Sequence, residues 1–183
     1  MEKVDRVSRR YLLPIPAIVA ILALAALGTA AVFVYSGVYD IGADAPHTKP
    51  VFWLIEQMRD RSIAVRSDSI VPPADLADPK RIAAGGHLYA SLCTACHLAP
   101  GMKNTDLSRG LYPKAPQLAY GTDLSPGEEF WIIKHGIKLT AMPAWGRTHS
   151  DDELWNVVAF LTKMPFLHPG QYDAAAGTPS SAK

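Results

Sequence analysis

The residues best suited to carry out chemistry lie in the short segment Cys93-Thr94-Ala95-Cys96-His97. These are the only two cysteines of the 183-residue sequence, and a histidine directly follows the second. A pair of cysteines separated by two residues is typical of a redox-active dithiol, of half a zinc site, or of a covalent haem attachment. The sequence around the pair favours one of these three chemistries.

A zinc site and a redox dithiol both fit the chain poorly. Structural zinc is four-coordinate and takes a second pair of cysteines or histidines at similar spacing, whereas His87, His135 and His149 form no such pair. A thioredoxin-type dithiol lies at the start of a helix in a βαβ unit. Here the cysteines follow a predicted helix in a chain without strand-like alternation. A zinc site, a redox dithiol and a chance occurrence of the motif remain the alternatives to haem attachment.

Covalent haem attachment uses every element of the motif. Two thiols on one helical turn can form thioethers with the two vinyl groups of a haem, and the adjoining histidine then lies beneath the iron. C-x-x-C-H is the signature of c-type haem attachment. We therefore predict that Cys93, Cys96 and His97 bind one haem c, with His97 as an axial ligand of the iron.

The second axial ligand decides the function of such a haem. Histidine plus methionine suits electron transfer, whereas an open position suits gas binding or peroxide chemistry. Met142 lies 45 residues after His97 in a predicted loop between two helices, and Pro143 stiffens this loop. That separation gives the chain room to pass round the haem edge, and we predict Met142 as the second ligand. The other methionines are less suitably placed: Met1, Met58, Met102 and Met164.

Helices with clear start signals are predicted to position these residues. Asp78 before Pro79 predicts an N-cap and a helix over about 79–92. Ser125 and Ser150 each precede an acidic residue by three positions, which predicts capping boxes and helices over about 126–136 and 151–164. The stretch 99–125 is irregular and needs a cofactor to pack against. No segment alternates with period two, so the predicted fold class is all-α.

An apolar stretch near the N-terminus predicts a membrane anchor. No Asp, Glu, Lys or Arg lies between Arg10 and Asp40, and about 20 apolar residues suffice for a membrane-spanning helix. We predict an anchor over 12–36, since the stretch is longer than a signal-peptide core and lacks a convincing cleavage site. More basic residues precede the stretch than follow it. The N-terminus, 1–11, is therefore expected in the cytoplasm of a bacterium and the remainder in the periplasm, on the inner membrane.

The order of the motifs resembles the class I cytochrome c family in its membrane-anchored, single-haem bacterial form. The resemblance covers about 80–167 and rests on Gly85 with Tyr89, CTACH, Pro116-Gln117-Leu118, MPAWG at 142–146 and DDELWNVVAFL at 151–161. It implies that the helix of Gly85 crosses the helix of Leu154. It also implies that the carbonyl of Pro116 accepts the Nδ1 proton of His97, although a plain loop proline is the alternative.

The expected organisation follows from these elements. Residues 37–78 are predicted to be a periplasmic connector with a short amphipathic helix from Val51 to Ile63, 79–168 the cytochrome c domain, and 169–183 a flexible tail. Trp131 and Trp145 are candidates for hydrogen bonds to a haem propionate, or core aromatics. The 18 Lys and Arg against 17 Asp and Glu leave the chain near neutral, which does not indicate a nucleic-acid-binding protein.

The expected function is that of an electron carrier that converts no substrate itself. Its partners would be membrane redox proteins, as a subunit of or a shuttle for a quinol-oxidising, dehydrogenase or terminal oxidase complex of a respiratory chain. The lipid bilayer would be a further partner. A haem-based gas sensor or peroxidase with a labile Met142, and a structural accessory subunit, are the alternatives.

Overall fold

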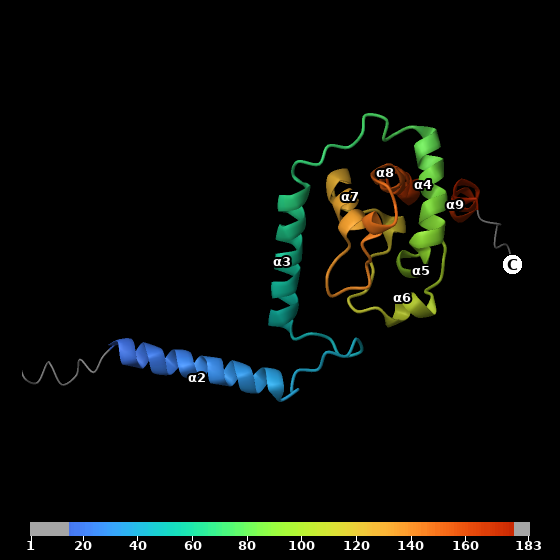
Figure 1. Ribbon diagram of the computed structural model, residues 1–183. Coiled ribbons are helices and arrows are strands. Elements are labelled where there is room, and N and C mark those ends of the chain that lie inside the picture. Colours follow the sequence, from blue (N-terminus) through green and yellow to red (C-terminus); the bar gives the residue numbers. More distant parts are fainter. Residues whose placement is uncertain (1–14, 178–183) are drawn as a thin grey trace, which may run out of the picture. The chain divides into compact units, whose positions relative to one another are not determined.

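The computed structural model describes residues 15–177, and each regular element within this range is a helix (Figure 1). The predicted all-α class is confirmed. The chain divides into two compact units, Met1–Ala45 and Pro46–Lys183.

The described part of the first unit is dominated by helix α2, Ile15–Tyr35. None of its residues is buried, and it carries no charged side chain. By length and composition α2 is able to cross a membrane. The basic residues predicted to orient it, Lys3, Arg6, Arg9 and Arg10, lie outside the described residues, as does the start of the predicted anchor at 12.

The second unit contains the remaining helices. They are α3 Lys49–Ser67, α4 Pro79–Leu92, α5 Thr94–His97, α6 Asp106–Gly110, α7 Pro126–His135, α8 Asp151–Leu161 and α9 Pro169–Ala176, with 3-10 turns η1 Leu118–Tyr120, η2 Trp145–Arg147 and η3 Met164–Phe166. The three predicted start signals are confirmed. The Asp78 carboxylate accepts from the Lys80 amide at 2.7 Å, and Ser125 and Ser150 both form complete capping boxes.

The core lies where α4 crosses α8, as the family resemblance implied. A Cβ built on Gly85 would overlap the carbonyl of Asn156 and lie 2.9 Å from the Cβ of Phe160. Only glycine therefore permits this approach of the two backbones. Tyr89 and Phe160 are fully buried beside the crossing, and their ring centroids are 5.6 Å apart.

The segment predicted as a flexible tail instead begins with helix α9, which packs on α4. Tyr172 and Ala176 are only 4% and 3% exposed. A Cβ on Gly86 would lie 2.6 Å from the carbonyl oxygen of Ala175. The prediction of a flexible tail is therefore wrong for 169–176, because a composition rich in Ala and Gly also suits a short helix against a glycine-lined surface. Residues 178–183 lie outside the described part.

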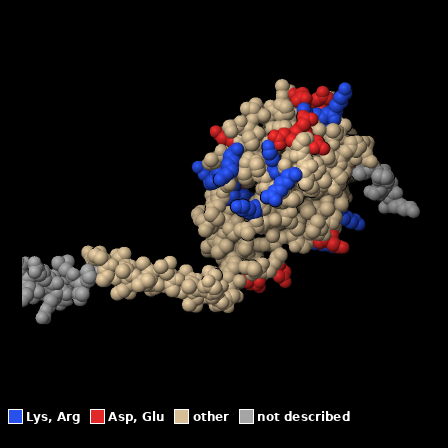
Figure 2. Space-filling model, in the orientation of Figure 1, with Lys and Arg blue, Asp and Glu red and all other residues tan. Residues whose placement is uncertain are grey.

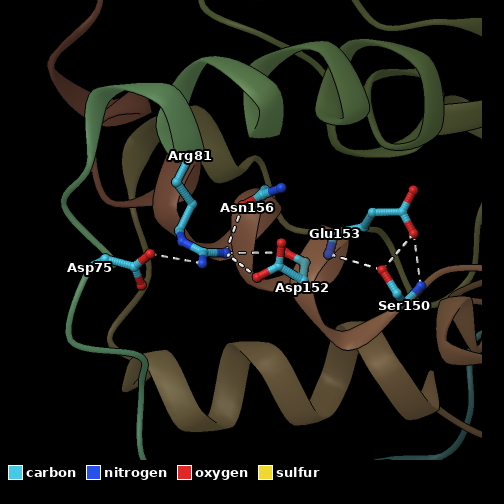
Figure 3. A network of polar contacts seen from close by, with 6 residues as sticks. All are labelled: Asp75, Arg81, Ser150, Asp152, Glu153 and Asn156. Atoms are coloured by element: carbon cyan, nitrogen blue, oxygen red, sulfur yellow. Dashed lines mark hydrogen bonds and ion pairs between the residues drawn. The ribbon is translucent and has the colours of Figure 1, made fainter.

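A polar network fixes the start of α4 to the start of α8 (Figure 3). Arg81 donates from Nη1 to the carboxylate of Asp152 and to the side-chain oxygen of Asn156, both at 2.8 Å. Its Nη2 donates to Asp75 at 3.0 Å, and these two carboxylates raise the pKa of the guanidinium. The network therefore ties the segment before α4 to the helical core of the second unit.

Helix α3 is longer than the predicted 51–63 and belongs to the compact second unit. That unit begins at Pro46, whereas we expected a separate connector as far as 78. The end of α3 packs on α7: a Cβ on Gly127 would lie 2.9 Å from the carbonyl oxygen of Ile70 and 3.5 Å from that of Ser67. Ile63 and Ser67 are buried. The sequence pattern showed the amphipathic helix but not which surface its apolar face covers.

Candidate haem-binding site

A cavity of about 430 Å³ opens between the loops and helices of the second unit. All five residues predicted to form the site contribute to its lining: Cys93, Cys96, His97, Pro116 and Met142. Three separate stretches of the chain supply them, namely the turn α5, the irregular segment 99–125 and the loop between α7 and α8. The tertiary fold therefore brings the predicted residues round one space, whose volume is typical of a cofactor site.

The two thiols lie on one turn, at the point where α4 gives way to α5. Cys93 ends α4, and its carbonyl accepts from the amides of Cys96 at 3.2 Å and of His97 at 2.9 Å. Burial, and secondly the neighbouring Cys96, raise the pKa of Cys93 to about 12. A reactive redox dithiol needs a lowered thiol pKa. This environment therefore disfavours the dithiol and suits a buried attachment point.

The imidazole of His97 is held by one backbone contact. Its Nδ1 lies 2.9 Å from the carbonyl oxygen of Pro116, which is the contact that the family resemblance implied. Since a carbonyl only accepts, Nδ1 carries the proton and Nε2 keeps its lone pair. Burial lowers the pKa of His97, against the opposing effect of this hydrogen bond. The ring is therefore kept neutral and oriented, as a metal ligand requires.

Met142 lies in a loop that is fixed from both sides. Its amide donates to Thr140 Oγ1 at 3.1 Å, and its carbonyl accepts from the amide of Ile137 at 3.2 Å. Gly136, with φ of +65°, ends α7, and a Cβ there would lie 2.6 Å from the Met142 carbonyl oxygen. The backbone that carries the thioether is thus set by a tight turn that only glycine accommodates.

Most of the remaining lining is apolar, with a few charged groups. The apolar side chains include Ile63, Leu92, Leu111, Leu118, Leu124, Ile132, Ile133, Ile137 and Leu161. The charged side chains are Arg59, Asp60, Lys114 and Glu129. Burial raises the pKa of Glu129, while a hydrogen bond of 2.6 Å from Thr122 opposes that shift. The cavity therefore suits a large apolar cofactor with a small number of polar groups.

The two tryptophans considered from sequence differ in position. Trp145 lines the cavity, so it remains a candidate partner for a propionate. Trp131 is not part of the lining and lies with its ring 5.0 Å from that of His135. Trp131 is therefore a surface and packing residue of α7 in this structure.

Several lining residues escaped prediction from sequence. Arg59, Asp60 and Ile63 belong to α3, and Glu129 to α7. The regular spacing of apolar residues in α3 indicated an amphipathic helix, and left open whether its apolar face packs on the domain, on the membrane or on a partner. No local signal indicated that this face borders the same cavity as CTACH, because the two segments are separated by about thirty residues of connector and helix.

The residues present fit haem c in their chemistry. Two thiols on one turn match two vinyl groups, a neutral imidazole offers nitrogen, and a methionine offers a thioether from a separate loop of the same cavity. Histidine with methionine is an axial pair found in cytochromes c. The largely apolar lining would exclude water from much of the surface of a bound haem.

Comparison with known proteins points the same way. Residues 80–161 match the family model described as cytochrome C oxidase, cbb3-type, subunit III. No curated protein and no solved structure gave a match. The matched stretch begins in α4, ends with α8, and includes CTACH, Pro116 and Met142. The match supports a c-type cytochrome domain over 80–161, the kind of domain that transfers electrons through covalently bound haem.

Proposed function

We propose that this protein is a membrane-tethered cytochrome that carries single electrons in a bacterial respiratory chain. The observation that carries the proposal is the convergence of Cys93, Cys96, His97 and Met142 on one largely apolar cavity. The bound haem supplies a one-electron iron couple. With His97 and Met142 both available as ligands, the iron would transfer electrons and would have no open position for a substrate.

Each residue of the chain has a distinct part in this proposal. Cys93 and Cys96 hold the cofactor by thioether bonds, so that it stays in the domain through many turnovers. His97, kept neutral and oriented by the Pro116 carbonyl at 2.9 Å, donates Nε2 to the iron. Met142 completes the coordination from the opposite loop, and its loop hydrogen bonds reduce the movement of a weak ligand.

One haem is proposed for this chain. The sequence contains two cysteines, both in CTACH, and one c-type haem attached by two thioethers uses both of them. The haem content of the purified protein, measured against its polypeptide concentration, tests this stoichiometry. A ratio near one haem per chain is expected.

Tethering is proposed from α2, whose 21 residues match the length required to cross a bilayer. The basic residues of 1–11 orient the N-terminus to the cytoplasm, with an anchor over 12–36 and the haem domain in the periplasm, where haem c is attached. Cleavage of α2 as a signal sequence is the alternative. The mass of the mature protein distinguishes them: an anchor retains residues 15–35.

The proposed partners are redox proteins of the same membrane. The matching family is described as a subunit of a terminal oxidase, which supports a place within or beside a respiratory complex. A quinol-oxidising complex, a dehydrogenase and a terminal oxidase are the candidate partners, with the protein as a permanent subunit or a shuttle. Purification in mild detergent, followed by identification of the proteins that remain bound, tests this proposal.

The absorption spectrum of the purified protein is the main test of the electron-carrier function. The ferric form is expected to show the weak band near the red edge that reports a sulfur–iron bond, and carbon monoxide is expected to leave the reduced spectrum unchanged. Rapid binding of carbon monoxide at neutral pH would instead support a gas sensor or peroxidase with a labile Met142.

A further inference from the structure

Helix α3 lies outside the segment 80–161 that matches the cytochrome family, yet it forms one wall of the haem cavity. Arg59, Asp60 and Ile63 line the cavity, and Ile63 is 6% exposed. The end of α3 is held against the start of α7 by the close approach at Gly127. The cavity is therefore closed on this side by an element that the matched segment does not supply.

The chemistry of the haem determines what this wall must face. Protohaem carries its two vinyl groups on adjacent pyrrole rings and its two propionates on the other two rings, at the opposite edge. With Cys93 and Cys96 attached to the vinyl groups at α5, the propionate edge of a bound haem would be directed away from α5. Figure 1 shows α3 and α5 on opposite sides of the second unit. The propionates of a bound haem would thus be directed toward the α3 side of the cavity.

Two carboxylates in a largely apolar cavity need cationic partners, because burying an unpaired charge is costly. The lining contains two permanent cations, Arg59 and Lys114. Lys114 lies two residues before Pro116, which contacts His97, so it belongs to the wall of the axial histidine. Arg59 belongs to the wall that α3 forms. Figure 2 shows further Lys and Arg side chains over α3 and α7 on the viewed face.

The contacts of Arg59 leave it able to bind a further carboxylate. Its Nε donates to Asp60 at 2.8 Å, and its Nη2 lies 3.5 Å from Glu56. A guanidinium has five N–H donors in a planar fork, so these two contacts do not exhaust it. The side chain is 33% exposed, which places it at the rim, where a propionate reaches the cavity mouth.

We propose that Arg59 is the ion-pair partner of a haem propionate, and that α3 is an added wall which holds the propionate edge and raises the reduction potential of the haem. The inference rests on the proposed function, because it requires haem in this cavity. A fixed cation near the haem favours the ferrous state, which carries one positive charge fewer than the ferric state.

The test compares midpoint potentials of the full-length holoprotein in detergent, measured by spectroelectrochemical titration. Arg59→Gln is expected to lower the ratio of ferrous to ferric haem at fixed ambient potential about tenfold, which is about 59 mV for a one-electron couple. Arg61→Gln is the matched control, since Arg61 is an exposed residue of α3 that does not line the cavity. Its shift is expected to be less than half as large. Arg59→Lys, which keeps the charge, should recover most of the potential.

Outcomes that contradict the inference differ from those that contradict the proposed function. Equal shifts for Arg59→Gln and Arg61→Gln, or a large shift only for Lys114→Gln, would overturn the assignment of Arg59. If Arg59→Gln accumulates without haem, a wild-type potential for Arg59→Lys together with loss of haem from Arg59→Gln alone supports the assignment. Equal loss of haem from Arg61→Gln overturns it. Haem staining after denaturing electrophoresis is the independent readout, and wild-type protein without covalent haem would refute the proposed function itself.

Discussion

The interior of the second unit is filled by side chains on one side and surrounds a cavity on the other. On the side of α4, α8 and α9, side chains fill the space between helices: Tyr89, Leu154, Phe160 and Met164 are at most 1% exposed. On the other side the chain surrounds a cavity of about 430 Å³, lined by irregular segments and by α3. One side is therefore packed by its own residues, whereas the other needs a cofactor to complete its core.

This contrast has consequences for what each side tolerates. In the packed side, backbone meets backbone at Gly85, so even one methyl group is excluded. In the cavity side, loops such as that of Met142 are fixed by a few hydrogen bonds and a left-handed glycine. Five changes test how far the two sides differ, from the largest expected effect on stability to the smallest.

Loss of the haem should have the largest effect. Without the haem, the apolar side chains that line the cavity of about 430 Å³ are left in contact with water, and the loss of their burial removes much of the hydrophobic stabilisation of this side. Domains are only marginally stable, so a loss of this kind can abolish the fold. The double variant C93S/C96S should therefore lose cooperative thermal unfolding, as followed by circular dichroism against the wild-type holoprotein. Cooperative unfolding at the wild-type temperature would show that the packed side is sufficient for the fold.

A methyl group at the α4–α8 crossing should have the next largest effect. Gly85→Ala forces the backbones of α4 and α8 apart, because the new Cβ would overlap the carbonyl of Asn156. We expect a loss of at least about 3 kcal/mol in the free energy of unfolding. Gly170→Ala is the control, since a Cβ on Gly170 of α9 meets nothing within 4 Å. Equal denaturation midpoints for both variants would contradict the tight crossing.

Met142→Ala should show separately how Met142 contributes to stability and how it contributes to iron coordination. Met142 is half-buried, so we expect a stability loss of about 2 kcal/mol, together with loss of the sulfur–iron band and rapid binding of carbon monoxide by the reduced protein. Met102→Ala, at an exposed methionine, should leave the spectrum unchanged. An unchanged spectrum for Met142→Ala would refute Met142 as the axial ligand.

Removal of a helix cap on the packed side should have a modest effect. The Ser150 hydroxyl accepts from the Glu153 amide at 3.4 Å, and the Glu153 carboxylate accepts from the Ser150 amide at 2.8 Å. Ser150→Ala is expected to cost about 1 kcal/mol, measured by guanidinium denaturation of the holoprotein. Ser69→Ala, at an exposed position, serves as the control. Unfolding of the two variants at the same denaturant concentration would contradict a capping role for Ser150.

Glu129→Gln should have the smallest effect on stability, and only above pH 4.5, which is the ordinary pKa of this carboxyl. Burial raises the folded-state pKa, so the folded protein holds this proton more tightly than the unfolded chain. The associated stability is present below pH 4.5 and is lost as the pH rises through the folded-state pKa. Glu129→Gln should therefore lose less stability than wild type as the pH rises from 4.5 to about neutral, in melts at several pH values. Glu56→Gln, outside the cavity, is the control. Parallel pH curves for wild type and Glu129→Gln would contradict the shift.

A structural feature could be predicted from the sequence when the interactions that produce it join residues close together in the chain. The N-caps Asp78, Ser125 and Ser150 are set by contacts within three residues, and all three were predicted correctly. The tail from 169 was wrongly predicted as flexible, because the stability of α9 comes from burial of Tyr172 against distant residues. Short-range hydrogen bonds require particular residue types at fixed spacing, so they can be predicted from sequence. The docking of a weakly amphipathic segment requires no such pattern and cannot.

The sequence by itself determined that this chain carries a C-x-x-C-H haem motif, helices with defined starts and one apolar helix of membrane-spanning length. It could do so because motif spacing, helix capping and hydropathy are local properties of the chain. Only the tertiary structure decided that α3 borders the cavity, that Gly136 fixes the turn before Met142, and that Glu129 and Arg59 share a lining with His97. These relations join residues tens of positions apart, and only the packing of the folded chain brings such residues together.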